Sequence, residues 1–136
     1  MTKARRINEV DAIWDGRELD FAMSIDGLSE LKSCFREFAY GTYHLAHSSI
    51  VSDSAVTMME IRHGEEKLRV SLEPGKVVFT GNKKAMLLLA DNMETLLNLW
   101  AAGGKQHFHF DPSSNQLLLE PDSEAFILSP RRVSGQ

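Results

Sequence analysis

Apolar residues alternate with polar ones along several short stretches of the chain, and this two-residue period predicts β-strands. From Leu19 to Ile25 every second residue is apolar, and the preceding Asp15-Gly16 pair is typical of a tight turn between two strands. A second alternation from Leu68 to Leu72 predicts a half-exposed strand. The Glu73-Pro74-Gly75-Lys76 sequence after it is typical of a hairpin turn, because proline fixes φ and glycine allows a positive φ. We therefore expect two hairpins.

Two other stretches have apolar residues at the three- and four-residue spacing of an amphipathic helix. The first is predicted to start at a cap formed by Asp26 and to end between Tyr40 and His47. The second starts at Gly81-Asn82 and ends at Gly103-Gly104, because glycine takes the left-handed C-cap at no steric cost. The apolar faces consist of Leu28, Leu31, Phe35 and Phe38 in the first helix and of Met86, Leu89, Met93, Leu96 and Trp100 in the second.

Further strands are expected after the second helix, at Gln106–Asp111, Leu117–Leu119 and Ala125–Leu128. The predicted order β-β-α-β-β-β-α-β-β-β indicates an α+β fold. In this fold one or two mainly antiparallel sheets carry both helices on one face. The strand, helix and strands from Leu19 to Ile61 are followed by the same succession from Val77 to Leu128, which suggests an internal pseudo-repeat.

The composition is that of an ordinary globular protein. The chain has 136 residues, of which 43% are hydrophobic and 25% charged, so we expect a single α+β domain over residues 1–136. The formal net charge of −4 argues against a nucleic-acid partner, since phosphate contacts require clustered positive charge. No apolar run resembles a signal peptide or is long enough to cross a bilayer, so we expect a cytoplasmic protein without a membrane partner.

The sharpest candidate for chemistry is the alternation of His107, His109 and Asp111. In a strand these three side chains project from the same face, and two imidazoles with a carboxylate can bind zinc or iron. Metallohydrolases with this spacing need further histidine and aspartate ligands, and the sequence offers no second cluster of that kind. We therefore predict a solvated sheet face, with no catalytic residue, metal or cofactor. The alternative is a small metal-dependent hydrolase that uses this strand.

Acidic residues gather in two places, before the first helix and around the last predicted turn. Such carboxylates suit an exposed surface that meets a basic protein, although solvated turns carry the same residues. Tryptophan is enriched at binding hot spots, and Trp14 beside its turn is a better candidate for contact than Trp100, which continues a helix stripe. The candidate partner-binding residues are Trp14, Asp15, Glu18, Asp20, Glu120, Asp122 and Glu124.

The C-terminal half, from about Leu68 to Ser129, carries a pattern of helix, strand and turns that is more specific than its periodicity. Its segments are Gly81-Asn82-Lys83-Lys84, Leu87-Leu88-Leu89-Ala90-Asp91, Leu96-Leu97-Asn98-Leu99, His107-Phe108-His109-Phe110-Asp111-Pro112 and Leu119-Glu120-Pro121-Asp122-Ser123-Glu124. This pattern resembles immunity protein family 32, small bacterial proteins that accompany polymorphic toxins and protect the producing cell.

The resemblance implies a non-enzymatic protein that binds a cognate toxin and neutralises it by stoichiometric occlusion. An adaptor or chaperone that docks a secreted effector without inhibiting it is a further alternative. The residues before Leu68 lie outside the resemblance, and neither the toxin's chemistry nor the oligomeric state follows from the sequence.

Overall fold

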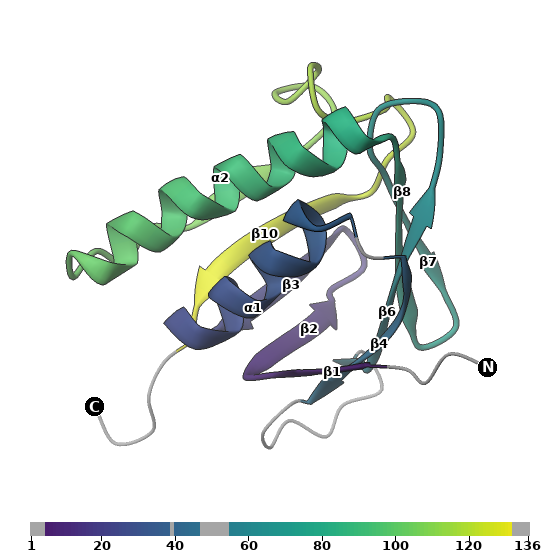
Figure 1. Cartoon of the computed structure of the whole chain (residues 1–136). Coiled ribbons are helices and arrows are strands. Elements are labelled where there is room, and N and C mark those ends of the chain that lie inside the picture. Colours follow the sequence, from purple (N-terminus) through teal and green to yellow (C-terminus); the bar gives the residue numbers. More distant parts are fainter. Residues whose placement is uncertain (1–4, 39, 47–54, 132–136) are drawn as a thin grey trace.

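The computed structural model describes residues 5–38, 40–46 and 55–131, which contain two helices and ten strands (Figure 1). The helices are α1 (Ile25–Arg36) and α2 (Lys83–Ala101), and the strands are β1 (Arg5–Asn8), β2 (Val10–Trp14), β3 (Glu18–Met23), β4 (Gly41–Ala46), β5 (Ala55–Val56), β6 (Met58–His63), β7 (Arg69–Glu73), β8 (Lys76–Gly81), β9 (Phe108–Phe110) and β10 (Ala125–Pro130). The strands form two five-stranded sheets. Sheet A has the order β1-β4-β6-β8-β7, and sheet B has the order β5-β2-β3-β10-β9.

The α+β class is confirmed, but the expectation of mainly antiparallel sheets is wrong, because both sheets are mixed. In sheet A, β1 runs parallel to β4 and β6 runs parallel to β8. In sheet B, β3 runs parallel to β10. The hairpins β2-β3 and β7-β8 are antiparallel, as their turn sequences predicted. A parallel pair joins strands that a long connection separates, so no local turn sequence reveals it.

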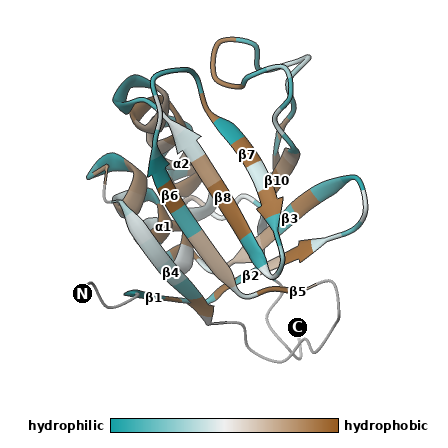
Figure 2. Cartoon of the chain, turned by 90° about the vertical axis from the view of Figure 1, so that its right-hand side faces the viewer, coloured by the Kyte–Doolittle hydropathy of each residue, from teal (hydrophilic) through white to brown (hydrophobic). Residues whose placement is uncertain are grey.

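The two helices lie side by side on one face of each sheet, as predicted. They lie in front of sheet B in Figure 1 and behind sheet A in Figure 2. Two ion pairs join the helices: Lys32 Nζ is 2.7 Å from Glu94 Oε2, and Arg36 Nη2 is 3.0 Å from Asp91 Oδ1. Because the later residue of α1 pairs with the earlier residue of α2, the helices run antiparallel.

Both helices begin with a side-chain cap. The N–H of Gly27 donates to Ser24 Oγ (3.1 Å), and the N–H of Ala85 donates to Asn82 Oδ1 (2.8 Å). Asp26 is therefore not the cap but a first-turn residue, where its carboxylate still complements the helix dipole. The first helix also ends earlier than predicted, at Arg36, and Phe38 then takes a left-handed backbone conformation with φ 52°.

The chain after the first helix is extended rather than helical. His44, which the longer predicted helix would have placed near its C-terminus, lies on β4 and is exposed, and His47 lies outside the described residues.

A cluster of phenylalanines connects the two sheets with α1. Phe79 of β8 in sheet A lies 6.0 Å from Phe21 of β3 and 5.9 Å from Phe126 of β10, both in sheet B, measured between ring centroids. Phe35 of α1 packs edge-on against Phe79 at 4.9 Å, and Phe110 of β9 stacks on Phe126 at 4.6 Å. All five side chains are buried, so the two halves of the chain contribute to the same core.

The suggested internal repeat is visible in the topology. The succession β2-β3-α1-β4-β6 is followed by β7-β8-α2-β9-β10, and four neighbouring strands of sheet A (β4-β6-β8-β7) correspond to four of sheet B (β9-β10-β3-β2). The parallel contacts have the same register, because Met58 lies opposite Lys76 in one and Ala125 opposite Glu18 in the other. Each unit thus contributes a hairpin to one sheet and its last strands to the other.

Candidate partner-binding site

His107, His109 and Asp111 do not converge on one position. The two imidazoles stack with their centroids 6.5 Å apart. Strand β9 ends at Phe110, and Asp111 instead closes the following turn. Its carboxylate accepts hydrogen bonds from the Ser113 hydroxyl (2.5 Å) and the Ser114 N–H (2.9 Å), which lower the pKa of Asp111. Within the described ranges, no group of three or more His, Cys, Asp or Glu side chains is placed to hold a metal ion.

A chain of hydrogen bonds links His107, Ser129 and Asp20 across sheet B. His107 Nδ1 lies 3.0 Å from Ser129 Oγ, and the Ser129 hydroxyl donates to Asp20 Oδ1 at 2.9 Å. A catalytic serine donates its proton to an imidazole, which a carboxylate orients from the other side. Here the serine is the middle member and donates to the carboxylate, so His107 is not placed to act as its base. The arrangement holds β3, β10 and the start of β9 together.

The hairpin between β2 and β3 holds the first group of partner-binding candidates. Asp15 is exposed, and its Oδ1 accepts hydrogen bonds from the N–H groups of Glu18 (2.9 Å) and Arg17 (2.8 Å). These bonds lower the pKa of Asp15 and fix the turn. Trp14 is half-buried and packs against the core. The ring offers only part of its surface to a partner.

The second group of candidates comes close to the first, because β3 and β10 are parallel and begin side by side. Glu124 precedes β10 and is half-buried. Asp122 forms an ion pair with Arg69 Nε at 2.8 Å, which lowers the pKa of the carboxyl group. The Glu120 side chain accepts a hydrogen bond from the Lys67 N–H at 3.1 Å. Two of these three carboxylates therefore hold their own loop against β7 and the residues before it.

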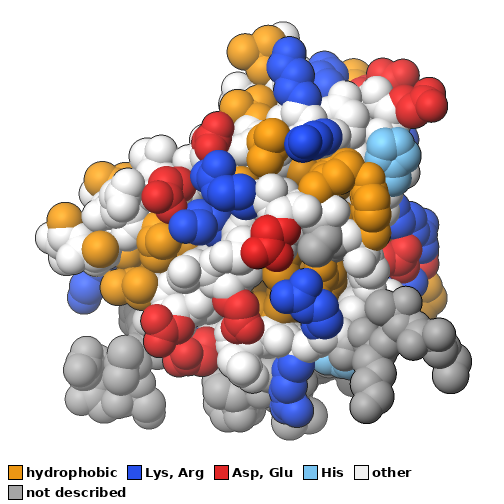
Figure 3. All heavy atoms as spheres, in the orientation of Figure 1, with side chains coloured by type: hydrophobic (Ala, Val, Ile, Leu, Met, Phe, Trp, Pro, Cys, Tyr) orange, Lys and Arg blue, Asp and Glu red, His pale blue; other side chains and the backbone are white. Residues whose placement is uncertain are grey.

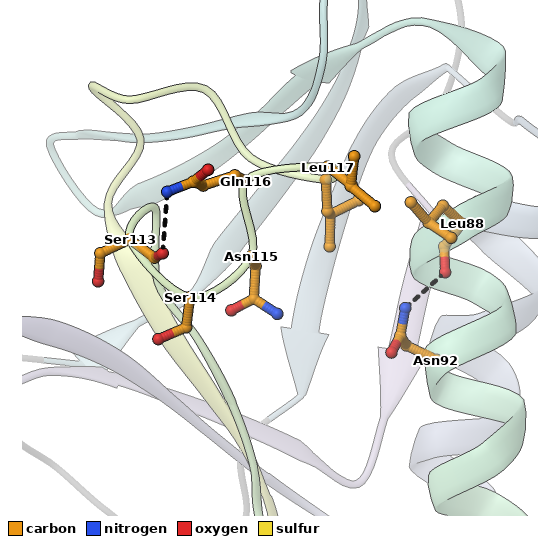
Figure 4. Close-up of a pocket in the computed structure, with 8 residues that line it drawn as sticks. Leu88, Asn92, Ser113, Ser114, Asn115, Gln116 and Leu117 are labelled. Carbon is orange, nitrogen blue, oxygen red and sulfur yellow. Dashed lines mark hydrogen bonds between the residues drawn. The ribbon is translucent and has the colours of Figure 1, made fainter.

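A groove that no sequence pattern indicated lies between α2 and the loop after β9; we call it the α2 groove (Figure 4). It has a volume of about 490 Å³, with Leu88 and Asn92 of α2 on one wall and residues 113–118 on the other. A second hollow of about 440 Å³ shares Leu88 and continues along the helix to Lys83, Lys84 and Asp91. The two hollows meet at Leu88 and follow the N-terminal half of α2, and the name α2 groove covers both.

The loop wall of the α2 groove is fixed by hydrogen bonds. Asp111 and Asn115 exchange two of them at 2.9 Å: the N–H of Asp111 donates to Asn115 Oδ1, and the N–H of Asn115 donates to the Asp111 carbonyl. The Gln116 side-chain amide donates to the Ser113 carbonyl, as Figure 4 shows, and Lys67 Nζ donates to the Gln116 carbonyl at 2.7 Å. The loop is therefore tied both to itself and to the segment before β7.

Leu117 is the most exposed large apolar residue described, with 89% of its surface accessible. The strand predicted at Leu117–Leu119 is wrong: the segment is a turn, with a single bridge from Leu119 to Leu68. Leu118 and Leu119 are buried and anchor the loop, which leaves Leu117 pointing away from the core. Sequence alone treats these three leucines alike, because only the tertiary anchor distinguishes them.

The start of α2 is positively charged. Lys83 and Lys84 occupy its first turn and are exposed, and that turn has no acidic residue. The unpaired amide groups at a helix N-terminus add further positive potential. Figure 3 shows Lys and Arg side chains near this end of α2, with apolar side chains beside them and Asp and Glu side chains at the neighbouring edge. Lys83 and Lys84 thus place two exposed positive charges at the second hollow, which Asp91 also lines.

Comparison with known proteins finds a family that is similar to the C-terminal part of the chain. Residues 76–129 match the family model of immunity protein 32, which confirms the resemblance seen in the sequence. The matched segment contains β8, α2, β9 and all of β10 except Pro130, and every residue that lines the α2 groove. No curated protein and no solved structure matches the chain. Neither helix in the described part of the chain is long and apolar enough to span a membrane.

Proposed function

We propose that this protein is a cytoplasmic immunity protein, which binds a cognate bacterial toxin and neutralises it by stoichiometric occlusion. The observation that carries the proposal is the match of residues 76–129 to immunity protein 32. The partner is accordingly a toxin protein rather than a nucleic acid, and the role is non-enzymatic.

The geometry of the described residues is consistent with surface recognition. Asp111 is engaged in a turn and Ser129 donates to a carboxylate, so the candidate catalytic groups serve the fold. In contrast, the α2 groove combines an exposed apolar side chain, a hydrogen-bonded loop and uncompensated charge. Protein interfaces are typically built from such a mixture of apolar anchors and surrounding polar groups.

Co-expression with the toxin domain encoded by the neighbouring gene tests the proposal. Protection requires nearly every toxin molecule to be occupied, so the two proteins should co-purify with a dissociation constant of about 1 nM or less, and growth should be restored. A complex that forms without restoring growth would instead indicate an adaptor. If the protein neither protects against the neighbouring toxin nor forms a complex with it, the binding role is refuted.

A further inference from the structure

We infer that the α2 groove is the surface that contacts the toxin, and that its occupant is a toxin segment with an apolar side chain next to acidic residues. This inference rests on the proposed function and specifies where and how the partner is recognised. It differs from recognition through the acidic residues around β3 and β10.

The apolar part of the inference depends on Leu117. Its side chain is 89% exposed, whereas the next most exposed large apolar residues of the described chain are Tyr40 at 50% and Ile25 at 46%. Leu117 adds little to the core, because its neighbours Leu118 and Leu119 make the buried contacts. Across the groove, Leu88 is half-buried, so an apolar side chain inserted between the two leucines would bury surface on both walls.

The loop is already ordered in the shape that a partner would meet. Ordering a flexible side chain or loop on binding reduces affinity, and a loop fixed beforehand avoids most of that cost. The hydrogen bonds among Asp111, Ser113, Asn115 and Gln116 supply this order without using Leu117. A rigid loop with an exposed leucine at one wall of a groove is therefore suited to act as an anchor.

The acidic part of the inference depends on Lys83 and Lys84. Cations in the first turn of a helix oppose its dipole, so these lysines do not stabilise α2. Other cations on this face are paired, such as Lys32 with Glu94 and Arg36 with Asp91. Among the described residues neither Lys83 nor Lys84 has an ion-pair partner. Carboxylates on an incoming segment would meet both the ammonium groups and the helix N-terminus.

The competing surface is less available than its sequence suggests. Asp122 is neutralised by Arg69, and Glu120 accepts a backbone hydrogen bond, so both are already used within the protein. A basic partner would therefore meet the exposed Asp15 and Asp20, which already accept hydrogen bonds within the protein, and the half-buried Glu18 and Glu124. Lys83 and Lys84 lie beside an exposed apolar side chain, whereas Asp15, Asp20, Glu120 and Asp122 are engaged within the protein, and this is why the groove is favoured.

Binding of the purified neighbouring toxin domain to variants, measured by biolayer interferometry, tests the inference. Leu117→Asp should weaken binding by about 30-fold or more, mainly through faster dissociation, because it removes a central apolar anchor. A Lys83→Glu/Lys84→Glu double variant should slow association by about tenfold at low salt, with the difference shrinking as salt is added. The controls, Ile25→Asp and Lys105→Glu, introduce an acidic side chain at single exposed positions away from the groove and should bind normally.

Circular dichroism and thermal unfolding establish that each variant is folded, which is expected because none of the changed side chains is buried. A photo-crosslinker in place of Leu117 should label the toxin within or beside an acidic segment, whereas the same group at Ile25 should not. Normal binding by both groove variants, with loss of binding in Glu18→Lys/Glu124→Lys, would overturn the inference and leave the immunity role intact. Absence of binding by the unaltered protein would remove the proposed function itself.

Discussion

Phe126 lies where both sheets meet, and replacing it with alanine tests whether the two halves of the chain share one core. Its side chain is fully buried, with ring centroids of Phe110 at 4.6 Å, Phe79 at 5.9 Å and Phe21 at 6.1 Å. Truncation removes one ring from all three contacts and leaves a cavity that the surrounding strands cannot fill.

The expected loss is about 4 kcal/mol, within the range of about 3–5 kcal/mol for buried phenylalanine-to-alanine changes. Domains are stable by only about 5–15 kcal/mol, so this change removes a large part of the total. For a chain of this size it corresponds to a fall in Tm of about 15 °C. Phe108→Ala is the matched control: Phe108 lies on the edge strand β9 and is half-buried, and its loss should be about 1–2 kcal/mol.

Urea unfolding, followed by tryptophan fluorescence and circular dichroism, provides the assay. Both probes should report one coincident transition in the unaltered protein and in each variant, because both sheets depend on the same aromatic cluster. A loss below about 2 kcal/mol for Phe126→Ala would contradict the shared core. Separate transitions for the two probes would contradict the proposal that residues 1–136 form a single domain.

Three further outcomes follow from the structure. Hydrogen bonds from Arg62 and then Lys76 hold the pKa of Glu60 at about 2, below its usual 4.5, so the associated stability is present at neutral pH and is lost as pH falls toward 2. Because these groups are partly solvated, this contribution to stability amounts to about 1 kcal/mol. Glu60→Gln should therefore flatten the pH dependence of the urea midpoint between about pH 5 and pH 2, and an unchanged pH dependence would contradict the contribution. Burial raises the pKa of the Cys34 thiol, so a disulfide reagent should modify the native protein about 100-fold more slowly than the unfolded chain, and equal rates would show an accessible thiol. Elemental analysis should find no stoichiometric transition metal. About one zinc or iron per chain, lost in a His107→Ala/His109→Ala double variant, would favour the metallohydrolase alternative.

Local features of the fold could be predicted from the sequence. The Pro74-Gly75 turn forms the β7-β8 hairpin, with Gly75 at φ 70°. The second helix begins at the predicted cap Asn82, and Gly103 follows its end at φ 93°. Trp100, expected in the core, is buried there. In each case the information lies within a few neighbouring residues, so periodicity and turn chemistry reveal it.

The partners of the strands could not be predicted in this way. Parallel contacts such as β6 with β8 and β3 with β10 join segments far apart in sequence, and the same alternating pattern would serve an antiparallel neighbour equally well. The repeat was visible in outline, but the exchange of strands between its two units depends on tertiary packing.

In the candidate site, too, local features could be predicted from the sequence and tertiary contacts could not. His107 and His109 share a face as expected, whereas Asp111 does not join them, because β9 ends before Pro112 and the carboxylate caps a turn. The exposure of Leu117 follows from the anchoring of Leu119 on Leu68, about fifty residues earlier in the chain, and no local pattern encodes that contact. The sequence thus supplied the residues of the groove without indicating their arrangement.

Titration of toxin activity with this protein tests the central claim most directly. The neighbouring toxin domain is held at a concentration far above the expected dissociation constant, and its residual activity is measured against the molar ratio of added protein. Stoichiometric occlusion predicts a linear decrease that reaches zero at a fixed small ratio, independent of incubation time. Inactivation that continues with time at a low ratio would indicate catalysis, and undiminished activity at a large excess would contradict an immunity role.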